Sequence, residues 1–348
     1  MSNIIEMKRP RRLSLQQRQA RLIEIFSRDR RGHDDVFWLK ENAELLNILS
    51  NGDSRPDRID LEPYAALYRD LPQRLRFFPQ YYRFLLSICL DLEDLGMRGG
   101  AGSEICDLVL MLDLPEMEIS DLQRAEARRL LARRKQLTPD PALDDRLRAF
   151  ISRPETFALP NRKAAYELTH IVFYLSDYGR IDPQLGAQAA TSLEFAGLLA
   201  FLDQDADLLA EVCIAMRLSG QQPSGIWEDW LAREIVGFDL GCTSADALRD
   251  DYHEYLVVNW WAGQAGLAPF RDQMPRGSNS FVRRARKTGP LRAMSELMFR
   301  LGEARSRDWQ AMRPAIENAL CEEGCGILLG AERSSDHFDD FFEGFARA

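Results

Sequence analysis

The chain has 348 residues, of which 45% are hydrophobic and 28% charged, with a net charge of −9. These proportions are ordinary for a globular protein, and the length suits two domains or one large helical assembly. No apolar run approaches the roughly 20 residues that cross a bilayer, so we expect no membrane span. The start has no apolar signal region and the six cysteines form no disulfide pattern, so we expect a cytoplasmic protein.

Residues 1–31 form the first predicted region, a basic N-terminal arm. They hold nine Lys or Arg residues against three Asp or Glu residues, a local charge of +6. Nucleic-acid binding is not expected, because the arm has few aromatic residues for base stacking and the remaining chain is acidic. We expect the arm to be solvated or to dock a protein partner.

Helical periodicity dominates the rest of the chain, and strand patterns are nearly absent. Apolar residues recur at helix spacing between Gly and Pro residues. The pattern predicts helices over residues 36–49, 81–95, 103–112, 121–135, 161–178, 187–202, 205–219, 225–236, 246–262, 289–304 and 307–320. Short helices in succession, without a sustained heptad, favour an all-α fold of paired antiparallel helices arranged as an α/α toroid or solenoid.

Proline residues suggest where this helical chain divides. Pro154 and Pro160 bracket a break between an N-terminal helical region, 32–155, and a C-terminal helical region, 156–330. Residues 331–348 alternate acidic and aromatic side chains and are predicted to form a tail that could dock another protein. We place the candidate pocket in the C-terminal region.

One predicted helix carries a polar stripe on an apolar background. Glu167, His170, Tyr174 and Asp177 are spaced by three, four and three residues, so they project along one face. The residues around them are strongly apolar, which indicates a mostly buried helix. Buried imidazole and carboxylate groups must find partners or change their pKa.

A second histidine lies in a comparable setting. His253 follows Asp250, Asp251 and Tyr252 at the start of an apolar segment, and Asp250 repeats the acid-to-histidine offset of the first stripe. Glu194 and Glu211 also interrupt apolar helical segments. These residues supply the ligand types of a carboxylate-bridged iron, manganese or zinc site, which would use Glu167, His170, Glu211, Asp250 and His253.

Two interpretations without a metal use the same residues. In an acid–base pocket, His170 or His253 is the general base, Asp177 or Asp251 orients it, and Tyr174 or Tyr252 supplies a proton or binds an oxyanion. Alternatively, His170, Tyr174 and Asp177 only satisfy one another inside a polar core.

Three segments resemble a group of uncharacterised bacterial all-helical proteins. They are the T-H-x-x-F-Y-x-S-D-Y-G motif from Thr169 to Gly179, Asp207-Leu-Leu-Ala-Glu211, and the D-Y-H motif that ends at His253. The likeness covers about residues 161–262. It implies that the three segments belong to one site, and it carries no activity.

We therefore expect an enzyme or biosynthetic accessory protein that acts on a small molecule or peptide by acid–base or metal-assisted chemistry. The alternative is a non-catalytic helical scaffold for other proteins. An enzyme would need the polar stripe to face a water-accessible cavity, whereas a scaffold would leave it sealed and hydrogen-bonded.

Overall fold

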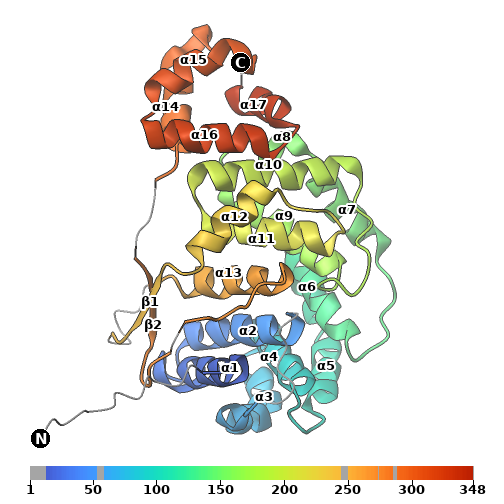
Figure 1. The fold of residues 1–348 in the computed structure, drawn as a ribbon. Helices are drawn as coiled ribbons and strands as arrows, with labels where there is room; N and C mark the ends of the chain where they lie inside the picture. Colours follow the sequence, from blue (N-terminus) through green and yellow to red (C-terminus); the bar gives the residue numbers. More distant parts are fainter. Residues whose placement is uncertain (1–12, 53–58, 244–249, 273, 285–287, 348) are drawn as a thin grey trace, which may run out of the picture.

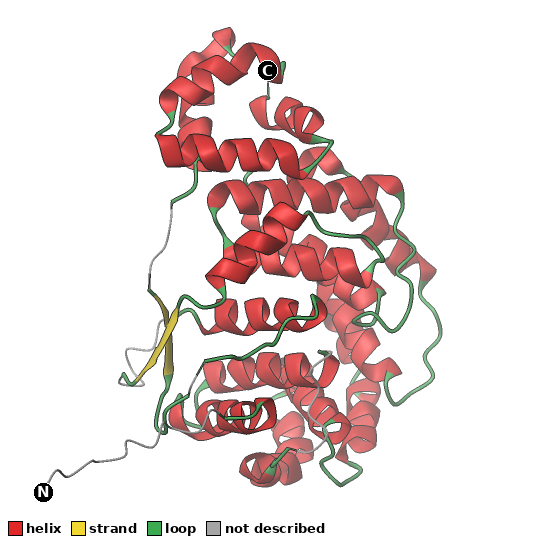
Figure 2. Cartoon of the chain, in the orientation of Figure 1, coloured by secondary structure: helices red, strands yellow, loops and turns green. Residues whose placement is uncertain are grey.

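The computed structural model describes residues 13–52, 59–243, 250–272, 274–284 and 288–347. Nearly all the regular structure in these ranges is helical, with one small sheet at the edge of the molecule (Figure 2). The predicted all-α class is confirmed, while closure into a toroid or solenoid stays a prediction. None of the helices in these ranges combines the length and apolarity that crossing a membrane requires.

The first half of the chain forms eight α-helices within the described residues. They are α1 (Leu15–Glu24), α2 (Val36–Asn51), α3 (Ala65–Phe77), α4 (Tyr82–Asp94), α5 (Ala101–Met111), α6 (Asp121–Ala132), α7 (Pro141–Ile151) and α8 (Pro154–Phe157).

The second half continues with longer apolar helices and the sheet. Its elements are α9 (Arg162–Leu175), α10 (Ala187–Asp203), α11 (Ala206–Leu218), α12 (Gly225–Glu234), β1 (Phe238–Gly241), α13 (Tyr252–Gln264), β2 (Ser280–Arg283), α14 (Leu291–Leu301), α15 (Trp309–Ala319), α16 (Glu322–Ser334) and α17 (Phe338–Ala346). The helix predicted over 246–262 begins only at Tyr252, and residues 244–249 lie outside the described ranges.

The helices are stacked in layers that do not follow chain order. Helix α2 contacts α13, α13 contacts α11, α11 contacts α10, and α10 contacts α16, as successive rungs from bottom to top in Figure 1. Helix α4 packs on α2, and α6 packs on both α4 and α9. The N-terminal and C-terminal helical regions therefore share a face, between α2, α4 and α6 and the helices α9, α11 and α13.

The predicted basic arm is folded from residue 13 onward. Its apolar residues Leu22, Ile23, Ile25 and Phe26 are buried, because they fall on one side of α1 and the π-helical turn that follows. Arg30 ends this segment with a fully buried side chain. Residues 1–12 lie outside the described ranges, so docking of a partner by that part stays a prediction.

The sheet was not predicted. Strands β1 and β2 pair antiparallel in a register that places Phe238 opposite Arg283. Each strand has four residues, too few for a clear alternating pattern in the sequence. The sheet fixes the residues before α13, because Asp250 and Asp251 accept hydrogen bonds from the backbone N–H groups of Phe281 and Arg283, at 2.8 and 2.9 Å.

Residues 331–334 of the predicted acidic tail end α16, and the following residues form α17, whose aromatic side chains face inward. Phe338 and Phe342 pack on Trp309, with ring centroids 5.1 and 5.0 Å apart. The buried hydrophobic residues form one cluster that includes both Leu22 and Ala346. The core is therefore continuous across the proline break on which the predicted regions were based.

Candidate functional site

A cavity of about 220 Å³ lies where the two helical regions meet. Six helices contribute to its wall: α2, α4, α6, α9, α11 and α13. Its polar lining consists of Glu44, Asn47, Arg83, Ser87, Glu126, Arg129, His170, Tyr174, Tyr178, Glu211 and His253. Half of the contributing helices lie before residue 155, so the cavity belongs to both regions rather than to the C-terminal one alone.

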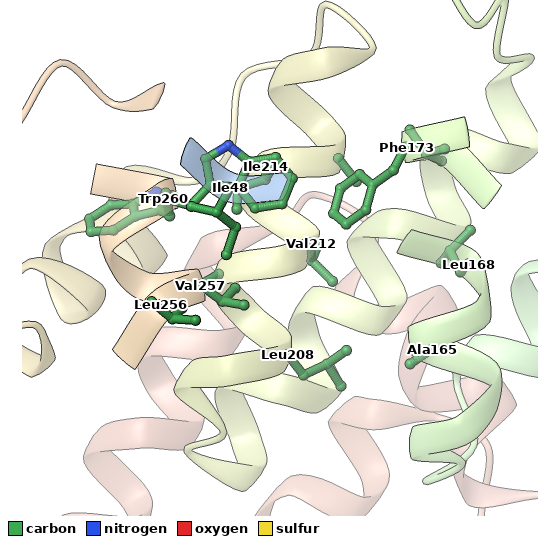
Figure 3. Packing of buried hydrophobic residues seen from close by; sticks show 14 of the residues in the cluster. Ile48, Ala165, Leu168, Phe173, Leu208, Val212, Ile214, Leu256, Val257 and Trp260 are labelled. Atoms are coloured by element: carbon green, nitrogen blue, oxygen red, sulfur yellow. The ribbon is translucent and has the colours of Figure 1, made fainter. Parts of the chain in front are cut away.

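The apolar wall of the cavity is largely aromatic. The Phe173 and Trp260 ring centroids lie 5.2 Å apart, and those of Tyr178 and Trp260 lie 5.8 Å apart. Figure 3 shows Phe173, Val257, Trp260 and Ile48 among the buried side chains contributed by α9, α13 and α2. This wall offers a flat, low-polarity surface to a bound molecule and lowers the local dielectric constant around the polar groups.

The two ends of helix α9 are fixed by its N-terminal cap and by the turn that follows it. The Asn161 side chain accepts a hydrogen bond from the N–H of Ala164, which fixes where the helix begins. The chain then leaves the helix through Asp177, Tyr178 and Gly179, whose φ angles are 43°, 54° and 85°. This left-handed turn returns the Tyr178 ring to the cavity wall.

His253 is held by a carboxylate that the metal and acid–base assignments did not include. Its Nδ1 lies 2.8 and 3.0 Å from the two carboxylate oxygens of Asp207 on α11. Tyr166 also donates to Asp207, at 2.8 Å. Burial disfavours the charged ring, but the Asp207 carboxylate outweighs this effect and raises the pKa of His253 to about 10.

The same pair sets the charge of Asp207. Burial opposes its ionisation, yet the charge of His253 and the hydrogen bonds from His253 and Tyr166 lower the pKa of Asp207 below its ordinary value. The His253 ring is therefore a cation at neutral pH and is oriented through Nδ1. The other ring nitrogen, Nε2, lies 4.0 Å from a carboxyl oxygen of Glu211.

Glu211 lies between the two histidines. Its side chain is only 3% exposed, and its oxygens lie 3.9 Å from Nε2 of His170 and 4.0 Å from Nε2 of His253. Thr169 donates a hydrogen bond to it at 2.5 Å. Burial raises the pKa of Glu211 to about 8, so the carboxyl group is mostly protonated at neutral pH.

His170 has the opposite tendency to His253. Burial lowers the pKa of His170 below 6.5, which leaves the ring neutral at neutral pH. Its ring stacks on Tyr174, with centroids 6.1 Å apart and planes only 6° from parallel. A neutral base, a protonated carboxyl group and a fixed imidazolium thus line one cavity.

The remaining charged groups of the cavity are paired with neighbours. Arg83 binds two carboxylates, Glu118 at 2.9 Å and Glu126 at 2.5 Å. Glu44 lies 2.7 Å from Lys40 and accepts a hydrogen bond from the Tyr252 hydroxyl at 2.8 Å. These pairs supply a polar rim whose charges are largely compensated.

Four of the predicted site residues share this cavity: His170, Tyr174, Glu211 and His253. Asp177 does not line the cavity, but it accepts a hydrogen bond at 3.0 Å from Arg129, which does. It therefore does not orient a histidine in the manner predicted.

The other predicted residues have partners elsewhere. Asp250 binds the buried guanidinium of Arg30 at 2.8 Å, and Asp251 binds the backbone of β2. Glu167 is paired with Lys163 at 3.8 Å. Glu194 accepts a hydrogen bond from Ser335, near the C-terminal helices.

Of the five residues of the predicted metal site, only His170, Glu211 and His253 therefore share the cavity. In the ranges that the structure covers, no three His, Cys, Asp or Glu side chains are arranged so that they could hold a metal ion. The sequence spacing of Asp250 and His253 would allow both to bind one metal ion. In the structure, the Asp250 carboxylate instead forms a buried ion pair with Arg30 of the N-terminal segment.

Several residues of the site were not assigned a role from the sequence. Asp207 opens one of the three segments that the resemblance placed in the site, but it was given no role; it lies four residues before Glu211, on the same helix face. Arg129, Glu44 and Glu126 carry no such signal, because they lie in ordinary amphipathic helices far away in the sequence. Only the packing of α2 and α6 against α9 and α13 brings them to the cavity.

Comparison with known proteins adds a family but no activity. The family described as Domain of unknown function (DUF6902) matches residues 1–348. No curated protein and no solved structure matches the chain. Because the match spans the full sequence, the chain belongs to the family described as Domain of unknown function (DUF6902).

Proposed function

We propose that this protein is an enzyme that moves protons on a small molecule bound in the cavity, by general acid–base catalysis. One observation carries the proposal: two histidine rings from different helices face the same buried carboxyl group, at 3.9 and 4.0 Å. The histidine side chains are 37% and 32% exposed, so water and a substrate can reach them. A scaffold would gain nothing from leaving such groups open to solvent.

The opposed pKa shifts suggest a role for each group. His170, neutral at neutral pH, would accept a proton from the substrate, and protonated Glu211 would donate one. The His253 imidazolium would stabilise negative charge that develops on a substrate oxygen. Asp207 would act as a positioning residue, because it fixes the orientation and charge of the His253 ring.

The size of the cavity favours a small molecule over a peptide. Pockets for drug-sized ligands commonly reach about 300–1,000 Å³, and this cavity holds about 220 Å³. The six cysteines are free thiols, three of them buried, which agrees with a reducing compartment such as the cytoplasm. We also propose that the family is bacterial and that its members use the T-H-x-x-F-Y-x-S-D-Y-G and D-Y-H motifs for this site.

The test is turnover of a small-molecule mixture. Purified wild-type protein would be incubated with a metabolite extract from bacterial cells, and mass spectrometry would record which compounds disappear or form. We expect turnover by the wild type and by the control Glu167→Gln, which removes a carboxylate from α9 outside the cavity. His170→Gln and His253→Gln should each lose it by a factor of about 100 or more.

The pH dependence of the reaction provides a second readout. The rate should rise as His170 loses its proton, below pH 6.5, and fall as Glu211 ionises near its pKa of about 8. Folding of every variant would be checked by circular dichroism. Equal turnover by wild type and by folded His170→Gln and His253→Gln would contradict the proposal and favour the scaffold.

A further inference from the structure

The arginine Arg129 stands out among the charged groups of the cavity. Its side chain is 7% exposed, and it lies in the wall of both the 220 Å³ cavity and a neighbouring cavity of about 380 Å³. Its guanidinium carbon lies 4.6 Å from the centre of the Tyr178 ring and 5.8 Å from that of Tyr174. These contacts hold the guanidinium group at the edge of the site.

The hydrogen bonds of Arg129 are incomplete. NH1 donates to Asp177 at 3.0 Å, and Asp177 is itself shared with Arg180 at 3.5 Å. The buried Nε of Arg129 has no hydrogen-bond acceptor within the described part of the chain. Arg83, the other arginine of this cavity, binds two carboxylates. A buried guanidinium whose Nε is unsatisfied and whose one carboxylate partner is shared keeps positive charge that a further anion at its edge would stabilise.

The charged groups of the cavity limit the charge of an anion that it would bind. Taking His170 and Glu211 as neutral, the charged groups are Glu44, Glu126, Arg83, Arg129 and His253. Two of these are negative and three positive, and each cation has a carboxylate partner: Glu118 and Glu126 for Arg83, Asp177 for Arg129 and Asp207 for His253. Because these charges are largely compensated, a carboxylate with a single charge fits the site better than a phosphate ester, with a charge of about −1.5 to −2.

We propose that the substrate of this cavity is a small carboxylate with a planar, apolar body, and that Arg129 binds its carboxylate group. The body lies against Phe173, Tyr178 and Trp260, which form the aromatic wall. The Tyr174 ring links the histidine to the arginine, since it stacks on His170 and faces the guanidinium of Arg129. This inference rests on the proposed function only in taking the cavity as the substrate site.

Binding of matched probes tests the inference without any assay of turnover. The probes are benzoate, phenylacetate and indole-3-acetate, each compared with its uncharged amide, together with phenyl phosphate. Isothermal titration would measure affinity, and the NMR signals of the His170 and His253 rings would report whether a probe occupies this cavity. We expect at least one carboxylate to bind about tenfold or more tightly than its amide.

Variants of neighbouring arginines separate the anchor from general charge effects. Arg129→Gln should weaken carboxylate binding by about tenfold or more and leave amide binding little changed. Arg129→Lys keeps the charge but loses the planar fork, so its affinity should fall between the two. Arg128→Gln is the matched control, because Arg128 lies on the same helix but lines only the neighbouring cavity. It should bind like the wild type.

The outcomes are distinct. Equal affinity for carboxylates and amides, retained affinity in Arg129→Gln, or no binding of any carboxylate at about 10 mM would overturn the inference. Tighter binding of phenyl phosphate would overturn the choice of carboxylate. If carboxylates bind as expected while folded His170→Gln still turns over its substrate, the proposed acid–base function fails and the anion site stands.

Discussion

Replacing Asp207 by Asn tests the electrostatics of the site most directly. The change removes a negative charge 2.8 Å from Nδ1 of His253 and keeps the shape of the side chain. The rise in the pKa of His253 from 6.5 to about 10 corresponds to about 5 kcal/mol, at about 1.4 kcal/mol per tenfold change in proton affinity. Because the His253 side chain is 32% exposed, solvent screening should reduce the stabilising contribution to about 2–3 kcal/mol.

The sign of the pH dependence follows from the raised pKa. The folded state binds the His253 proton more tightly than the unfolded state does, so the added stability is fully present below pH 6.5 and is lost as the pH rises toward about 10. Asp207→Asn should therefore unfold more easily than the wild type near about pH 6, and the difference should vanish near about pH 10.

Nuclear magnetic resonance of the imidazole rings measures the effect at its source. The chain has four histidines, so four titration curves are expected, and single His→Gln variants assign them. In Asp207→Asn the pKa of His253 should fall below 7, because burial still disfavours the charged ring. Glu167→Gln should leave the curve unchanged. A pKa that stays near 10 in Asp207→Asn would refute the assignment of this carboxylate as the cause.

Three further changes test the packing and electrostatics of the fold. Arg30→Met should cost about 3–5 kcal/mol in urea unfolding, since it leaves the buried Asp250 carboxylate without its cation and Glu41 with Arg31 alone. Arg284→Met, in an exposed pair, should cost below about 1 kcal/mol. The wild type should lose stability between pH 4.5 and about 8, because Glu211 ionises more readily in the unfolded chain than in its buried position. Glu211→Gln should remove this loss, so the free energies of unfolding measured at about pH 5 and about pH 9 should agree more closely in the variant. Gly197→Ala should lower the melting temperature and cost about 1–3 kcal/mol, because the added Cβ would lie 2.5 Å from the Trp227 ring; an unchanged melting temperature would contradict this packing.

Part of the site was visible in the sequence because its signals are local. His170 and Glu211 are polar residues inside apolar helical segments, and such residues must either find a buried partner or face a cavity. His253 stood out for the same reason. The acid that accompanies each histidine could not be chosen in this way. Asp250 and Asp251 are adjacent to His253 in the sequence, yet their hydrogen bonds go to Arg30 and to strand β2.

The sequence alone determined that the chain is helical, where most helices begin and end, and which three polar residues are conspicuous in its apolar segments. Helix periodicity and glycine or proline boundaries act over a few residues, so they can be read locally. Only the tertiary structure decided that α2, α4 and α6 complete the cavity, that Asp207 holds His253, and that Arg129 faces the same space. Those pairings depend on which helix faces pack together over more than a hundred residues of chain, a property of the whole core that no short segment encodes.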